Sequence, residues 1–252
     1  MSDADSNAKK AISTARDAQE RVGARLRAGI VLMAFSGDYP KRLPAAEAEF
    51  RQALAEAPDD VQARYQLGIV LLRQKKDEEG LKHLAVVAAA PAGDLSTNAR
   101  LLIANPRRAR EWFAPQFEAT TLQGETVSLA ALAGKVVVLD FWATWCPPCR
   151  ASVPELKGLL KKYSREKLVL ISISADKDED TCRKFVAEKN MDWPQIFDAD
   201  HVLIDRFNVN AFPTYLVVDG EGVVKKKIAG MDPQQSVAAR IKDTLQGMKE
   251  LN

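Results

Sequence analysis

The stretch Asp140-Phe-Trp-Ala-Thr-Trp-Cys-Pro-Pro-Cys-Arg150 is the most informative part of this sequence about both fold and function. Cys146 and Cys149 are separated by two residues, a spacing that lets two thiols close a small, reversible disulfide. An apolar run ends just before Cys146 and a helical pattern begins just after it, so we expect its sulfur at a helix N-terminus. Unpaired backbone N–H groups and the helix dipole stabilise a thiolate there and lower the pKa of the thiol. The pattern predicts a dithiol that exchanges electrons with other disulfides.

Strand and helix patterns alternate on both sides of this motif. The runs 135–142 and 167–174 are continuously apolar, which is typical of parallel strands buried on both faces. Hairpin patterns cover 117–129 and 214–228, with a short strand at 193–197, and helices are predicted at 147–163, 178–189, 200–207 and 233–249. The second part of the chain is therefore predicted to be an α/β domain, with a mixed central sheet and helices on both faces.

The first part of the chain has only helical patterns. Apolar residues at spacings of three and four predict one long helix over 11–33, with a break at 37–40. A 34-residue period then relates Ala46, Phe50 and Ala53 to Gly80, Leu84 and Val87, and a further helix over 96–113 contains Pro106. Residues 24–92 resemble tetratricopeptide repeats, which are helix pairs that stack on one another and usually bind protein segments.

We therefore expect an all-α helical-repeat domain at 1–113 and the α/β domain at 114–252, joined near 112–115. The first domain has two open interpretations. It binds or positions partner proteins, or it is a helical cap on the second domain.

Composition excludes several classes of protein. The formal net charge is +2, which does not favour a nucleic-acid partner. Three cysteines are too few for a disulfide-rich secreted scaffold. A single C-x-x-C pair, with His83 and His201 as the only imidazoles, supplies no zinc framework. No metal and no organic cofactor are expected.

The beginning of the chain bears on its location. The apolar run 28–35 is too short to span a bilayer, and the segment before it carries mixed charges, unlike a secretory leader. No transmembrane segment is expected in this chain. The sequence predicts a cytoplasmic protein, or a periplasmic or otherwise exported one if a leader has been removed.

Residues 115–250 resemble the thioredoxin superfamily, and within it the thiol-disulfide oxidoreductases of the TlpA and ResA type. The resemblance rests on the motif 140–149, on Pro154, on Phe212-Pro213-Thr214 and on Gly230. It implies a thioredoxin-like fold of the AhpC/TSA kind and a protein that reduces protein disulfides. It also implies an upstream electron donor that returns the protein to its reduced form.

The resemblance and the local chemistry together assign roles to four residues. Cys146 is expected to attack the substrate disulfide, and Cys149, one helical turn further, to resolve the mixed disulfide. Asp140, in an otherwise apolar strand, is expected to be buried below the disulfide and to relay a proton to or from Cys149. Pro213 is expected to be a cis proline that faces the cysteine pair.

Other residues are expected to contact the substrate or to pack in the core. Substrate contacts are expected at the residues flanking the cysteines and the proline: Trp145, Pro147, Pro148, Phe212 and Thr214. Cys182, on the inward face of its helix, is expected to be a small core residue.

Two other functions remain open. A thiol peroxidase of the peroxiredoxin kind has a Thr three residues before its reactive cysteine and a Pro upstream, whereas here Thr144 lies two residues before Cys146 and no Pro precedes it. The other is a repeat-based adaptor with only a minor redox role, which would bind its partner equally well without the two cysteines.

Overall fold

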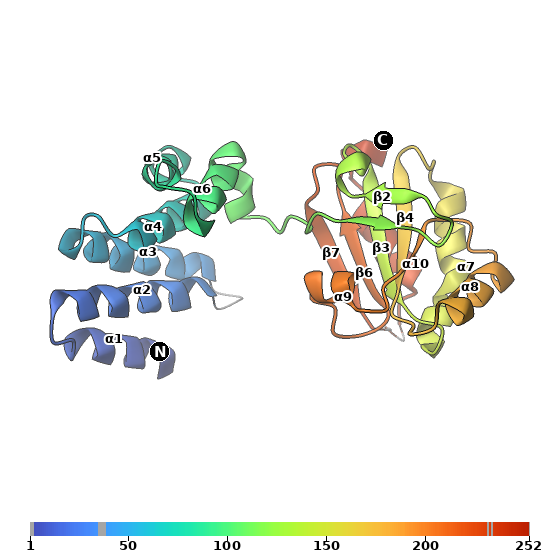
Figure 1. The fold of residues 1–252 in the computed structure, drawn as a ribbon, viewed down its shortest axis with the longest axis horizontal. Coiled ribbons are helices and arrows are strands. Elements are labelled where there is room, and N and C mark those ends of the chain that lie inside the picture. The colour runs from blue at the N-terminus through green and yellow to red at the C-terminus, as the bar shows by residue number, and fades with distance from the viewer. Residues whose placement is uncertain (1–2, 35–38, 231, 233, 252) are drawn as a thin grey trace. The chain divides into compact units, whose positions relative to one another are not determined.

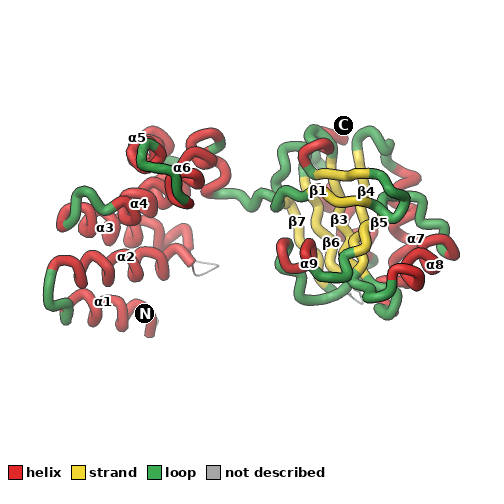
Figure 2. Tube along the Cα trace, viewed as in Figure 1, coloured by secondary structure: helices red, strands yellow, loops and turns green. Residues whose placement is uncertain are grey.

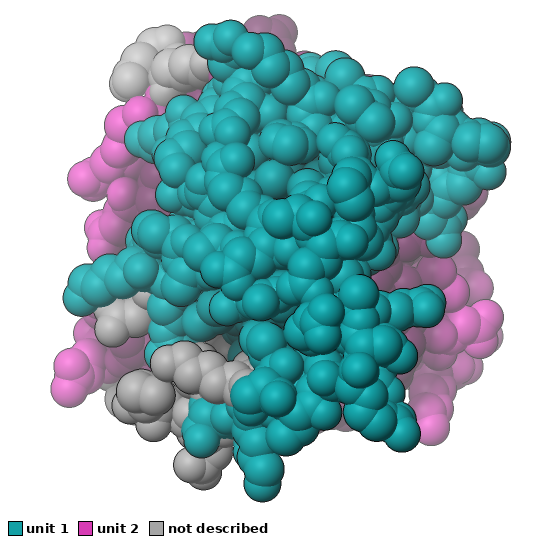
Figure 3. All heavy atoms as spheres, turned by 90° about the vertical axis from the view of Figure 1, so that its left-hand side faces the viewer, with its two compact units in different colours: residues 1–111 teal, residues 112–252 magenta. Residues whose placement is uncertain are grey.

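The computed structural model describes residues 3–34, 39–230, 232 and 234–251 (Figure 1). The chain divides into two compact units, Met1–Glu111 and Trp112–Asn252, which are coloured separately in Figure 3. Each unit has its own apolar core.

The first unit is helical throughout (Figure 2). Its elements are α1 (Asp3–Ser13), α2 (Ala18–Ala34), α3 (Tyr39–Glu56), α4 (Val61–Arg73), α5 (Asp77–Ala88), α6 (Asp94–Ala104) and a 3-10 turn (Pro106–Ala109). The prediction of a single helix over 11–33 was wrong, because α1 ends at Ser13 and α2 begins at Ala18. The Asp17 carboxylate accepts the N–H of Glu20 at 2.8 Å and so caps a new helix. The break predicted at 37–40 lies partly outside the described residues.

The 34-residue period corresponds to repeated environments in α3 and α5. Phe50 in α3 and Leu84 in α5 are both completely buried, and they occupy the same position in the period. The other period positions, Ala46 and Ala53 in α3 and Gly80 and Val87 in α5, are buried as well. The two helices therefore bury the same face of their sequence pattern, as helix-pair repeats do.

A glycine allows α2 to approach α3 closely. A Cβ added to Gly29 would lie 2.5 Å from the buried Phe50 ring, whereas one added to Gly23, in the same helix, would lie 3.3 Å from the flexible Arg27 guanidinium. We expect Gly29→Ala to destabilise the first unit by about 1–3 kcal/mol through overpacking. Gly23→Ala should be neutral or slightly stabilising, since alanine favours a helix interior. Helix melting followed by circular dichroism compares the two variants, and equal melting temperatures would contradict the predicted close packing.

The second unit is built on a five-stranded mixed sheet in the order β5-β4-β3-β6-β7. β3 (Val136–Trp142) and β4 (Leu168–Ser174) form the parallel centre, and β5 (Gln195–Phe197) adds in parallel at one edge. β6 (Thr214–Val218) pairs antiparallel with β3 and continues into β7 (Val224–Ala229). A separate hairpin of β1 (Glu118–Thr120) and β2 (Thr126–Ser128) precedes the sheet. The mixed sheet predicted from the sequence is confirmed.

Helices cover both faces of this sheet. α7 (Pro147–Lys162) and α10 (Val237–Leu245) lie on one face, where Ser152 of α7 bonds to Tyr215 of β6. α8 (Glu179–Glu188) contributes Phe185, whose ring contacts Trp142 on that same face with 5.4 Å between ring centroids. On the opposite face, Phe141 packs against Phe207 directly after α9 (Val202–Arg206). Among the described residues, no helix has the length and apolar character needed to cross a membrane.

Candidate active site

The two cysteines lie where β3 passes into α7, as the sequence predicts. Cys146 is the N-cap of α7, and its sulfur accepts the backbone N–H of Cys149 at 3.3 Å. The two sulfurs form a disulfide in this structure. Cys146 and Cys149 are 4% and 2% exposed. The Cys146 sulfur is therefore at the position where the helix dipole and the N–H groups of the first turn favour negative charge.

Asp140 lies within β3, two residues before the strand ends. Its side chain is 2% exposed. Burial raises the pKa of the Asp140 carboxyl from 3.8 to about 7, and a hydrogen bond from Ser172 opposes this only in part. A carboxyl that titrates near neutral pH can accept or release a proton under ordinary conditions.

A chain of hydrogen bonds ends at the Asp140 carboxyl. The Trp193 indole Nε1–H donates to Ser172 Oγ at 2.9 Å, and the Ser172 hydroxyl donates to Asp140 Oδ2 at 2.7 Å. The other carboxyl oxygen, Oδ1, is buried and has no hydrogen-bond partner. Ser172 can reach the carboxyl because it is the register partner of Asp140 in the parallel pair β3–β4.

A second set of hydrogen bonds connects Asp140's surroundings to the cysteine helix. Tyr215 is the antiparallel register partner of Asp140, so both side chains lie on the same face of the sheet. The Tyr215 hydroxyl and Ser152 Oγ are 2.7 Å apart, and Ser152 donates to the Cys149 carbonyl at 2.8 Å. Burial, and then the Asp140 charge, raise the pKa of Tyr215. The carboxyl therefore lies on the face that carries the first turn of α7.

Two aromatic rings flank the disulfide on its outer side. Trp145 is 61% exposed and contacts Phe212 edge-on, with 5.7 Å between ring centroids. Phe212 is half-buried and precedes Pro213 through a cis peptide bond. An exposed indole beside Cys146 offers apolar surface to a polypeptide that reaches the sulfur.

The remaining residues expected at the site differ in how much of each is accessible. Pro147 is exposed and Pro148 half-buried at the start of α7. Thr214 is completely buried, and its hydroxyl donates to the Ala211 carbonyl at 2.7 Å. Thr214, which the sequence places among the substrate contacts, is therefore enclosed in the protein, with neither its side chain nor its backbone exposed.

Thr144 is held by a buried carboxylate. Its N–H and hydroxyl both donate to Asp176, at 3.0 Å and 2.8 Å, and Ser174 also donates to this carboxylate, at 2.6 Å. The Thr144 hydroxyl is thus held by a hydrogen bond to the loop after β4.

Cys182, the third cysteine, is fully buried, and burial raises the pKa of its thiol to about 11, which keeps it protonated.

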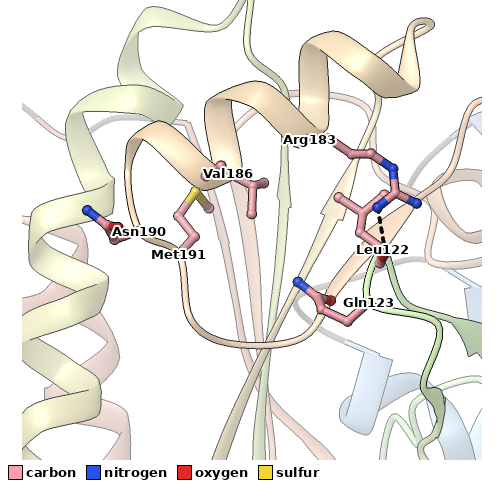
Figure 4. Close-up of a pocket in the computed structure, with 7 residues that line it drawn as sticks. Leu122, Gln123, Arg183, Val186, Asn190 and Met191 are labelled. Carbon is pink, nitrogen blue, oxygen red and sulfur yellow. Dashed lines mark hydrogen bonds between the residues drawn. The ribbon is translucent and has the colours of Figure 1, made fainter.

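Besides a smaller cavity of about 290 Å³, which Pro148 of α7 and Val237 of α10 help to line, two larger cavities adjoin described residues of this unit. One of about 450 Å³ adjoins the exposed face of Trp145 and is lined by Thr144, Trp145, Ala175, Asp176, Lys177, Asp178, Thr181 and His201. Another of about 430 Å³ lies between α8 and the turn of the β1–β2 hairpin, where Arg183 donates to the Leu122 carbonyl (Figure 4). The second cavity includes none of the residues expected at the site. No group of three or more potential metal ligands occurs in the part of the chain that the structure describes.

Sequence reasoning missed Ser172, Trp193, Tyr215 and Ser152. The alternation Ser172-Ile-Ser174 within a strand buried on both faces was a signal, because two hydroxyls on one face of such a strand need partners. Trp193 and Ser152 had no comparable signal, because only the fold brings them next to the strand.

A Cys-x-x-Cys disulfide at a helix N-terminus, on the sheet face that also carries a buried carboxyl, is the arrangement of a thioredoxin-like thiol-disulfide oxidoreductase. The AhpC/TSA family model matches residues 113–227. The thiol-disulfide oxidoreductase ResA of Bacillus cereus is 33% identical over 49% of this chain and 72% of its own length. The thioredoxin-like protein YneN of Bacillus subtilis is 38% identical over 44% of this chain and 66% of its own.

A solved structure agrees with these relatives. The putative thiol:disulfide interchange protein DsbE of Chlorobium tepidum superimposes with a TM-score of 0.51 at 27% identity, over 56% of this chain and 97% of that one. The chain belongs to the thioredoxin-like thiol-disulfide oxidoreductases of the TlpA, ResA and DsbE type.

Proposed function

We propose that this oxidoreductase reduces disulfides in proteins through Cys146 and Cys149. The observation that supports it most is the Cys146–Cys149 disulfide at the N-terminus of α7, with its first sulfur as the helix cap. A negative charge on that sulfur is stabilised by the helix, so a larger fraction of Cys146 is ionised at neutral pH and able to attack, and Cys146 is the better leaving group of the pair.

The exchange balances in two steps. The Cys146 thiolate attacks one sulfur of the substrate disulfide, forming a mixed disulfide and releasing the other substrate sulfur as a thiolate. The Cys149 thiolate then attacks Cys146, which forms the Cys146–Cys149 disulfide and releases the second substrate sulfur. Two electrons have passed to the substrate, and a dithiol donor must supply two to restore the enzyme.

Asp140 accepts the proton of the Cys149 thiol in this scheme. The Cys149 thiol must lose its proton before it attacks, and the buried Asp140 carboxyl can take that proton because its pKa lies near 7. Trp145, Pro147, Pro148 and Phe212 would contact the substrate chain, with Pro213 facing the disulfide.

Reduction of insulin by the full-length chain, with dithiothreitol as electron donor, tests the activity. We expect insulin to precipitate faster than with dithiothreitol alone. Hydrogen peroxide should not be turned over, since the Thr144 hydroxyl is held by Asp176 and no proline lies just upstream of it, between residues 116 and 143. Steady peroxide turnover that survives Cys149→Ser would instead favour a thiol peroxidase.

We further propose that the helical unit is a tetratricopeptide-like domain that binds or positions partner proteins. One observation in support is that Phe50 and Leu84, one period apart, are both completely buried. Another is the close approach of α4 and α5 at Gly68 and Gly80, where an added Cβ would lie 2.7–3.0 Å from the neighbouring helix. Such stacked pairs build the extended surfaces on which repeat proteins bind peptides.

The affinity of a variant that cannot exchange disulfides for a partner protein tests this second proposal. A partner is first captured covalently by Cys149→Ser, and its affinity is then measured for the full chain carrying both Cys146→Ser and Cys149→Ser. We expect affinity within a few-fold of wild type, because the helical unit is unchanged. Complete loss of binding without the two sulfurs would show that the helices hold no partner.

We propose that the protein works in a compartment where a dithiol donor can reduce it. This is the cytoplasm, or, for an exported protein, a compartment that receives electrons across the membrane. Quenching cells in acid, alkylating the free thiols and fractionating the cells would show in which compartment the reduced protein is found.

A further inference from the structure

We infer that Trp193 and Ser172 are positioning residues for the proton exchange at Asp140: the indole holds the Ser172 hydroxyl as a donor to Oδ2, so that Oδ1 receives the proton. This inference rests on the role proposed for Asp140. It adds the oxygen at which the proton is held and the two residues that select it.

The direction of the hydrogen bonds follows from the donors available. An indole N–H can only donate, so the 2.9 Å contact between Trp193 Nε1 and Ser172 Oγ makes the serine oxygen an acceptor there. The single Ser172 proton is then free to point at Asp140 Oδ2, 2.7 Å away. All three side chains are at most 3% exposed, so water does not compete for these positions.

The two carboxyl oxygens are thereby made unequal. Oδ2 already accepts a hydrogen bond from Ser172, whereas Oδ1 is buried with no partner. An unpartnered buried oxygen is costly as part of a carboxylate, and protonation relieves that cost. The proton therefore goes to Oδ1, and the Ser172 hydroxyl limits how strongly the carboxyl holds it, because its bond favours the charged form.

Two other elements on this face of the sheet carry titratable groups. β6 supplies Tyr215, which stays neutral because burial raises its pKa. α7 supplies Cys149 and Glu155; Glu155 acts on Tyr215 and accepts the N–H of Ala238 at 2.9 Å. From β4 and the segment before β5 the contacts are uncharged, Ser172 and Trp193. In the oxidised protein Cys149 is in the disulfide and does not titrate, so this form isolates the carboxyl.

The test measures the titration of Asp140 in the full-length oxidised protein. The infrared C=O band of the protonated carboxyl is followed against pH and assigned by its loss in Asp140→Asn. Ser172→Ala should raise the midpoint by about one pH unit, since a bond to the charged form is lost. Trp193→Phe should raise it by about half a unit, because the hydroxyl remains but is no longer held. Ser172→Thr, which keeps a hydroxyl, should stay near wild type.

Non-additivity separates positioning from general damage to the core. If Trp193 acts through Ser172, the double variant Ser172→Ala/Trp193→Phe should titrate like Ser172→Ala alone. Trp142→Phe is the matched control: it also removes a buried indole N–H on the same sheet face, but this N–H has no partner. We expect it to leave the midpoint unchanged.

Three results overturn the inference: an unchanged midpoint in Trp193→Phe, an equal shift in Trp142→Phe, or additive shifts in the double variant. None of them bears on the role proposed for Asp140, which fails instead if Asp140→Asn reduces insulin as fast as wild type; the proposed function fails only if the wild-type protein does not reduce insulin. The pH profile of insulin reduction gives the second readout, and its acid limb should move upward with the infrared midpoint in Ser172→Ala.

Discussion

Cys146→Ser is expected to lower insulin reduction to the rate of dithiothreitol alone. A serine hydroxyl at the α7 N-cap keeps the cap bond to the Cys149 N–H but is a poor nucleophile toward a disulfide, so no mixed disulfide forms. Cys149→Ser is expected to attack its substrate normally and then stop, because the resolving sulfur is missing. It should accumulate covalent adducts that dithiothreitol releases, visible as bands of higher mass on non-reducing gels.

Cys182→Ser provides the matched control for these two variants. It also removes one sulfur, but from a fully buried site on α8 whose thiol is kept protonated by a pKa of about 11. Its rate of insulin reduction should equal that of wild type. Activity that survives Cys146→Ser, or adducts that form on Cys182, would reverse the assignment of the nucleophile.

Asp140→Asn is expected to stabilise the second unit at pH 8 by roughly 2–4 kcal/mol. The folded carboxyl has a pKa of about 7, against 3.8 for the solvent-exposed carboxyl of the unfolded chain, a difference of about three units at about 1.4 kcal/mol each. Between these two values the unfolded chain has lost its proton while the folded protein keeps it. The stability of the wild type therefore falls as pH rises from about 4 and has reached its lower level above about 7.

Urea unfolding of the full-length protein at pH 5 and pH 8 measures this effect. All four tryptophans, Trp112, Trp142, Trp145 and Trp193, lie in the second unit, so tryptophan fluorescence follows that unit alone. The gain from Asp140→Asn should be larger at pH 8 than at pH 5, whereas Asp200→Asn, at an exposed position, should show no such difference. A gain that is the same at both pH values would mean that Asp140 does not titrate between them.

Asp140→Asn should also slow insulin reduction. The carboxyl that lowers the stability of the folded protein at high pH is the same group that is proposed to accept the Cys149 proton. An amide cannot take the Cys149 proton, and loss of a general base commonly costs about 10²-fold or more. A variant that is more stable but slower is the expected combination.

Local patterns in the sequence predicted most of the second unit. The two apolar runs became β3 and β4, and the Cys-Pro-Pro-Cys segment became the first turn of α7, because proline fits a helix start and continuous apolar runs fit buried parallel strands. The long first helix was mispredicted, since one apolar stripe continues across two helices and only the Asp17 cap separates them. Periodicity reports which side of a segment is buried and does not report where the backbone turns.

By itself, the sequence determined the dithiol, its place between strand and helix, and the strand that carries Asp140. These features depend on residues close together in the chain, for which residue spacing and secondary-structure propensity are enough to predict the local structure. Only the tertiary structure decided which side chains meet that carboxyl. Ser172 bonds to it across the register of β3 and β4, Trp193 bonds to Ser172 from the segment before β5, and Tyr215 is its antiparallel register partner. These contacts span 21 to 75 residues because sheet pairing joins segments without regard to their separation along the chain.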